Sequence, residues 1–106
     1  MDRRGIISLL KAAGVEAIYG WYKPGSEPKR PYAVVHWLYS SDFTADNANY
    51  FRIDNWQVDL ITDSKSEAVE SLVRDALASA GIRYQQEEQN DEGADYVRQI
   101  FTFKTR

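Results

Sequence analysis

The stretch YAVVHWLYSSDFTADNANYFRIDNWQVDLIT, residues 32–62, decides the fold because it holds the two longest strand-like segments of the chain. In residues 32–40, both sets of alternating side chains are largely apolar. A strand with two apolar faces is usually covered on both sides. Residues 50–62 form the second segment, and the polar run between the two segments predicts a turn that joins antiparallel strands.

In the second segment, the alternating apolar residues change from odd-numbered to even-numbered positions along the chain. Trp56, Val58 and Leu60 alternate with Gln57, Asp59 and Ile61. Upstream, Phe51 and Ile53 fall at the opposite parity. Either the strand is apolar on different faces at its two ends, or a bulge near residues 54–55 shifts its register.

The run DFTADNANYF, residues 42–51, places oxygen-bearing side chains close together. Asp42, Asp46, Asn47 and Asn49 have the chemistry of calcium ligands. A calcium loop of the EF-hand type also needs a central glycine and a downstream glutamate, and both are missing from this run. We therefore interpret the run as a turn in which Asp and Asn bond to their own backbone.

Two amphipathic helices flank these strands. In the first, Asp2 is the predicted N-cap and Gly14 stands where the helix ends. In SKSEAVESLVRDALASAG, Ser64 and Glu67 have the spacing of a capping box, and Gly81 fits the position just past the C-terminus.

Three further segments have the pattern of strands: residues 15–20, 82–89 and 95–103. Strands clustered between helices, with neighbours expected to be antiparallel, indicate an α+β fold. We predict a mostly antiparallel sheet of about four to five strands with two helices packed on it, in a single domain, residues 1–106.

Composition narrows the functional classes. The 106-residue chain is 43% hydrophobic, which is enough for a core, and it has no cysteine for disulfides or thiolate chemistry. A formal charge of -3 argues against direct nucleic-acid binding, which needs a basic face. The absence of an apolar run near 20 residues predicts a soluble, intracellular protein without a membrane span.

The sequence offers little for catalysis. His36, the one histidine, lies inside an apolar strand and is expected to be packed there. No nucleophile elbow, phosphate loop or zinc motif is present. We therefore expect no enzymatic activity, cofactor or metal. The last hairpin carries a group of carboxylates in a solvated setting: Glu87, Glu88, Asp91, Glu92 and Asp95.

Charge and apolar surface together suggest assembly. WYKPGSEPKRP, residues 21–31, is an exposed proline-rich loop that is basic at Lys23, Lys29 and Arg30. If this loop meets the acidic hairpin of a neighbouring copy, the contact is head-to-tail and closes into a ring. Two helices can cover only one face of the sheet, whereas residues 32–40 are apolar on both faces. The apolar surface expected to remain uncovered on the other face would also favour oligomers.

The order of several short motifs is similar to that in small tail-completion, tail-terminator or head–tail joining proteins of long-tailed bacteriophages and prophages. The resemblance covers most of the chain. A proline loop longer than expected and an isoleucine at position 61, in place of tyrosine, are departures from it. The matching positions are Pro31-Tyr32, Phe43, Ala45-Asp46-Asn47, Tyr50, Leu60, Thr62-Asp63 and Tyr84.

The resemblance implies a virion structural protein that forms a homo-oligomeric ring, for which a hexamer is one candidate. Its expected partners are itself, the tail tube protein and head connector proteins, first in the host cytoplasm and then in the virion. A head-closure (neck) protein and an unrelated small ligand-binding α+β domain are the alternatives. The predicted interface comprises Trp21, Tyr22, Lys23, Lys29, Arg30, Phe43, Asp46, Glu88, Asp91 and Glu92.

Overall fold

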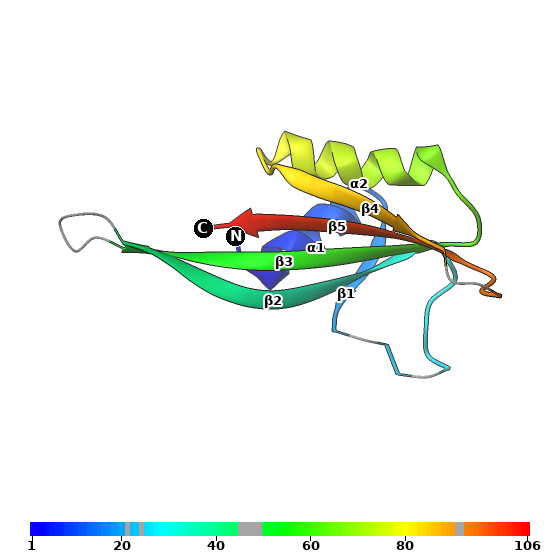
Figure 1. The fold of residues 1–106 in the computed structure, drawn as a ribbon. Helices are drawn as coiled ribbons and strands as arrows, with labels where there is room; N and C mark the ends of the chain where they lie inside the picture. Colours follow the sequence, from blue (N-terminus) through cyan, green and yellow to red (C-terminus); the bar gives the residue numbers. More distant parts are fainter. Residues whose placement is uncertain (21, 24, 45–49, 91–92) are drawn as a thin grey trace.

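The computed structural model describes residues 1–106 except 21, 24, 45–49 and 91–92, and the side chains of residues 42–51 are likewise outside the described set. It confirms the α+β class, with two helices and a five-stranded sheet (Figure 1). The elements are α1 (Arg3–Ala12), β1 (Glu16–Tyr19), β2 (Tyr32–Thr44), β3 (Tyr50–Thr62), α2 (Glu67–Ser79), β4 (Tyr84–Gln89) and β5 (Val97–Thr105).

Both helices begin at a capping side chain. Asp2 caps α1 as predicted, and its carboxylate accepts a hydrogen bond from the Gly5 amide at 2.9 Å. The predicted capping box of Ser64 and Glu67 is wrong: α2 begins at Glu67, and Ser66 is its N-cap. The Ser66 hydroxyl accepts from the amide of Val69, so the cap stands two residues later than the motif indicated.

The sheet has the strand order β1-β2-β3-β5-β4. All neighbours are antiparallel except β1 and β2, which are parallel, contrary to the expectation for adjacent strands. Parallel neighbours need a long connection, and residues 20–31 supply it. The described residues of this segment lie on the side of the sheet away from α2 (Figure 1).

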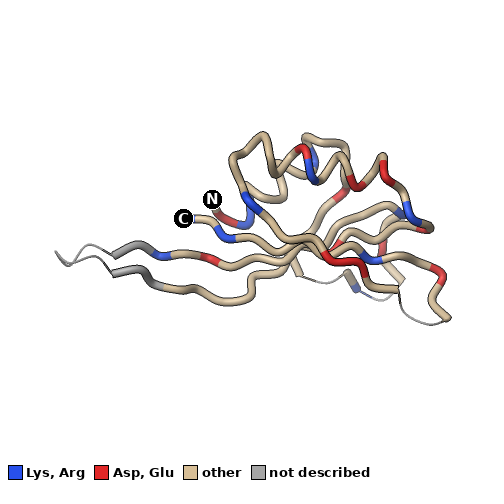
Figure 2. The backbone as a smooth tube through the Cα atoms, turned by 45° about the horizontal axis from the view of Figure 1, so that its top comes forward, with Lys and Arg blue, Asp and Glu red and all other residues tan. Residues whose placement is uncertain are grey.

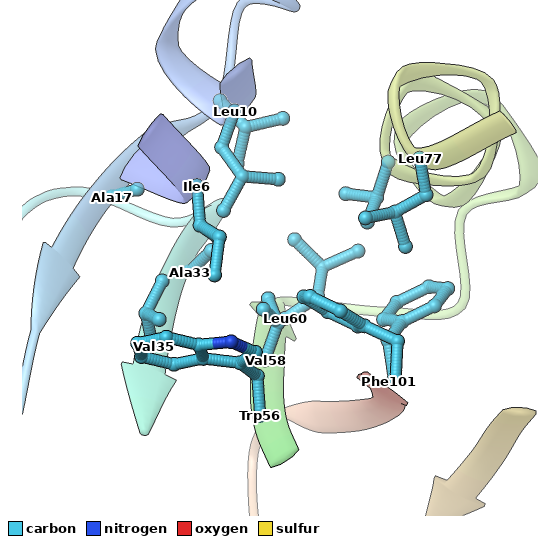
Figure 3. Close-up of a cluster of buried hydrophobic side chains, with 13 residues drawn as sticks. Ile6, Leu10, Ala17, Ala33, Val35, Trp56, Val58, Leu60, Leu77 and Phe101 are labelled. Atoms are coloured by element: carbon cyan, nitrogen blue, oxygen red, sulfur yellow. The ribbon is translucent and has the colours of Figure 1, made fainter. Parts of the chain in front are cut away.

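The core lies between the sheet and the two helices. Figure 3 shows Ile6 and Leu10 of α1 and Leu77 of α2 directed toward the sheet. Phe101 and Leu60 meet them from β5 and β3 and are fully buried. One face of the sheet is thus closed by apolar packing, as the helical stripes predicted.

The opposite face is partly closed as well. Val34 and Ile61 point away from the helices, yet their exposed fractions are only 1% and 5%. They line a pocket together with Tyr22 and Pro28 of the 20–31 segment. The first part of β2 is therefore covered on both sides within one chain, so the expectation of an uncovered apolar face is wrong at this end of the strand.

A register shift divides β2 into two parts. Trp37 pairs with Trp56, but Tyr39 pairs with Asn55, so Leu38 is the extra residue of a β-bulge. The bulge expected near residues 54–55 of β3 is absent: β3 pairs with β5 in unbroken register from Asp54 to Thr62, and the shift lies on β2, opposite Asn55. The other alternative therefore describes β3, whose apolar side chains face different sides at its two ends.

Beyond the bulge, β2 and β3 continue as an arm, residues 39–44 and 50–53, that extends past both chain ends (Figure 1). The molecule measures 52 × 27 × 24 Å, with a radius of gyration of 15.0 Å. A compact chain of this length has a radius of about 13 Å. The arm accounts for the elongated shape.

Candidate interaction surface

Three consecutive apolar side chains are exposed at the bulge. Trp37, Leu38 and Tyr39, here called the bulge patch, have exposed fractions of 41%, 42% and 56%. Single exposed apolar residues are ordinary, but three in a row at one bulge make this part of β2 a candidate contact surface. Figure 2 shows that β2 carries no Lys, Arg, Asp or Glu along this part.

Asn55 holds the bulge in place from β3. Its side-chain amide donates to the carbonyl of Tyr39 at 3.2 Å and to the hydroxyl of Ser41 at 2.9 Å. A bulge disrupts the regular ladder, and the amide provides a local partner for a backbone oxygen there. Asn55 is itself buried, so the bulge is a built feature of the strand pair.

Asp54 links the bulge patch to the arm. Its Oδ1 accepts from the Trp37 indole at 3.1 Å and from Arg52 Nε at 3.0 Å. These bonds lower the pKa of Asp54, with the Trp37 hydrogen bond as the largest cause. The Trp37 ring is thereby held at the surface in a defined position.

Arg30 connects the 20–31 segment to the residue that follows β3 and to the loop that precedes β5. Its guanidinium lies 3.1 Å from Asp63 Oδ1 and 3.1 Å from Asp95 Oδ1, and it also donates to the carbonyl of Asp95 at 3.0 Å. These contacts raise the pKa of Arg30, chiefly through the bond to Asp95. The basic loop and the residues beside the acidic hairpin thus meet inside one chain, whereas the sequence suggested a contact between neighbours.

The other described interface residues lie in two places: Tyr22, Lys23 and Lys29 in the 20–31 segment and Glu88 in β4. Tyr22 is half-buried, with its ring edge-on to Tyr32 at 5.4 Å, whereas Lys23 and Lys29 are exposed. Glu88 accepts from Gln99 and Asn90 and lies 3.4 Å from Lys65, and these contacts lower its pKa. Outside the described residues lie Trp21, Asp46, Asp91 and Glu92, together with the side chain of Phe43.

His36 forms a pair that sequence reasoning did not find. Its Nε2 lies 3.4 Å from Oδ2 of Asp59, which is 1% exposed, and Gln57 donates to the other carboxylate oxygen at 2.8 Å. A buried carboxylate requires such partners. The i, i+2 spacing of Gln57 and Asp59 on one strand face was the available signal, but strand pairing was needed to bring His36 beside them.

A second polar cluster lies under α2. Glu70, 3% exposed, accepts from Gln86 at 2.9 Å and lies 3.4 Å from Arg74. Gln86 also donates to Gln99, which in turn donates to Glu88 at 2.7 Å. This chain of bonds joins the helix to the two last strands of the sheet.

The described residues contain neither a metal-binding cluster nor a helix suited to span a membrane. No group of three or more His, Asp or Glu side chains is arranged to hold a metal ion within the described ranges. None of the helices in this part of the chain has the length and apolarity that crossing a membrane requires.

Comparison with known proteins gives a structural likeness. No protein-family model and no curated protein matches the chain. Among solved structures, it is similar to a chain in the virion of a native gene transfer agent particle, with a TM-score of 0.54 and 18% sequence identity. The match covers 96% of this chain and 85% of that one. This likeness shows a shared fold.

Proposed function

We propose that the chain is a non-enzymatic structural subunit of a phage-type virion, a tail terminator or head–tail joining factor that forms a ring at the end of the tail tube. The observation that carries the proposal is the bulge patch, an uncharged apolar group at the base of a projecting strand pair. The fold shared with a chain of a virion particle supports the setting, and so does the motif order of tail-completion proteins.

The topology suits a ring built by head-to-tail contacts. In the strand order, β1 and β4 form opposite edges of the sheet, so each subunit has two different lateral sides. When one lateral side of each copy binds the opposite lateral side of its neighbour, the same contact repeats from copy to copy until the ring closes. Because Arg30 is engaged within the chain, apolar burial at the bulge patch contributes more to this contact than the charges of the 20–31 segment.

The free edge of β2 is the second element of the contact. β1 pairs only with residues 32–35, so the remaining edge of β2 has no strand partner among the described strands. Unpaired edge groups readily add a strand from another chain. The bulge interrupts this edge and limits uncontrolled pairing, which directs the contact to a defined register.

Electron microscopy of the purified protein tests the proposal directly. At micromolar concentration, alone or mixed with the tail tube protein of the same particle, we expect closed rings in negative stain and a matching mass by sedimentation velocity. A chain that remains monomeric in both conditions would refute it. Rings that bind the head connector but leave tail tubes unbound would instead assign the head-closure role.

A further inference from the structure

The pocket between the 20–31 segment and the helix-free face of the sheet has the features of a ligand site. It has a volume of about 630 Å³, within the range of small-molecule pockets. Val34 and Ile61 provide apolar contacts, and the aromatic rings of Tyr22 and Tyr96 lie beside them. Arg98 of β5 also lines the pocket.

Arg98 differs from its neighbour Arg30 in its partners. Arg30 has two carboxylates, whereas Arg98 has no carboxylate partner within the described part of the chain. Its guanidinium lies 5.9 Å from the centre of the Tyr96 ring, and its Nε is buried without a hydrogen bond to any described residue. A half-buried cation in this state favours an anionic ligand.

The two carboxylates that line the same pocket are already engaged. Glu27 accepts from the Gly25 amide at 3.0 Å, and Asp63 accepts from Arg30. The Tyr22 hydroxyl is also buried and lacks a hydrogen-bond partner among the described residues. Burial, with smaller contributions from Glu16 and Tyr32, raises the pKa of Tyr22, so its phenol stays protonated and can donate.

We propose that this pocket binds a carboxylate carried on a flat apolar body, with Arg98 as the charged partner and the tyrosine rings as the apolar walls. Arginine matches a carboxylate through two parallel hydrogen bonds, and the aromatic walls suit a planar group. A phosphodiester chain would require several free cations along a groove. The carboxylate has two sources: an acidic side chain of a neighbouring copy, with an adjacent aromatic side chain as the flat body, or a free aromatic acid.

Nuclear magnetic resonance titration of the full chain tests the site with a matched pair of probes. Benzoate carries the charge, and benzamide is its neutral counterpart. We expect benzoate to shift the backbone amides of residues 32–34 and 96–98 in a saturable way, and benzamide to leave them unchanged. Equal shifts with both probes, or none with either, would overturn the assignment. Inorganic phosphate binding as well as benzoate would overturn the carboxylate class.

Variants identify the residue responsible. Arg98→Gln should weaken benzoate binding by about tenfold or more, because a charge-assisted hydrogen bond is lost. Arg98→Lys keeps the charge without the bidentate geometry and should give an intermediate affinity. Lys104→Gln removes a cation from the same strand outside this pocket and should bind as the wild type does. Loss of binding in Lys104→Gln equal to that in Arg98→Gln, with both spectra folded, would refute the role of Arg98.

Assembly measured in the same samples distinguishes the two sources. If a neighbouring copy supplies the carboxylate, saturating benzoate lowers the assembled fraction and benzamide does not. If benzoate binds and assembly is unchanged, the site takes a free acid. The pocket uses different residues from the bulge patch, so a failure of benzoate binding leaves the ring proposal intact, and a monomeric wild type leaves the pocket test intact.

Discussion

Two segments of β2, residues 33–35 and 37–39, are both apolar but lie in opposite environments. Residues 33–35 are at most 1% exposed, whereas residues 37–39 are at least 41% exposed. The first half has β1 at its edge, helices over one face and the 20–31 segment on the other (Figure 1). The second half lies beyond β1 and carries the bulge. An apolar strand pattern thus specifies a strand, and the neighbouring elements decide which part of it remains available to other molecules.

The largest expected effect concerns the covered half of the molecule. Phe101 is fully buried opposite Val58 in the layer that supports the first half of β2. Phe101→Ala should lower the free energy of unfolding by about 3–5 kcal/mol through lost transfer energy and a residual cavity. Urea denaturation monitored by tryptophan fluorescence measures it. A loss below about 1 kcal/mol would show that the helix-covered layer is loosely packed.

A smaller loss of unfolding free energy is expected where the helix-covered part of the sheet meets the arm. Trp56, 4% exposed, donates from its indole to the hydroxyl of Thr105 at 2.9 Å, and that hydroxyl donates to the carbonyl of Met1 at 2.9 Å. Thr105→Val keeps the shape and leaves the indole N–H without its partner, which should cost about 1–3 kcal/mol. The same denaturation experiment checks it. Thr105→Ser, which retains the hydroxyl, is the control and should recover most of the loss.

A still smaller effect, dependent on pH, is expected at the base of the arm. The pKa of Asp54 is lower in the folded protein than the value of about 3.9 expected in the unfolded chain. Its bonds to Trp37 and Arg52 therefore contribute their full stabilisation at pH values above about 3.9. That contribution is lost as the pH falls through the lower folded value. Asp54→Asn should therefore reduce stability near pH 6 by less than about 1 kcal/mol.

The pH dependence of the difference between the two proteins tests this interpretation. The gap in unfolding free energy between wild type and Asp54→Asn should narrow as the pH falls below about 4 and close below the folded pKa. Stability curves at matched pH values measure the gap. A gap that stays constant down to the acid transition would show that Asp54 acts through packing alone.

Local chemistry made much of the fold predictable. Asp2 as a cap, Gly81 after α2, the bounds of β3 and the two-helix, five-strand count all follow from spacing and residue type. The parallel pairing of β1 with β2 was missed because it depends on where the 20–31 segment crosses, which no short pattern encodes. Ser64 has the capping-box spacing to Glu67, but Ser66 is the N-cap, because α2 begins directly after it at Glu67.

The candidate surface was harder to predict for the same reason. A strand with two apolar faces suggested uncovered surface, but only the structure shows that Val34 is covered and Leu38 is not. Arg30 and Arg98 are both arginines beside tyrosines, and only their arrangement in space shows that Arg30 pairs with carboxylates while Arg98 has no carboxylate partner among the described residues. The positions of charged residues in a sequence indicate a charged patch, but they do not show which of these side chains form ion pairs within the folded chain.

The smallest effect on stability, and the sharpest test of the comparison, is expected at the bulge patch. Leu38→Ser should change the free energy of unfolding of the monomer by less than about 0.5 kcal/mol, because the side chain is exposed. It should raise the midpoint concentration of assembly by about tenfold, as truncation of an apolar anchor does. Leu72→Ser on α2 is the matched control, since Leu72 is 41% exposed on the helical side of the molecule. Sedimentation velocity across a dilution series measures both. Equal weakening in the two variants would mean that exposure alone, and not position at the end of the covered strand, directs self-association.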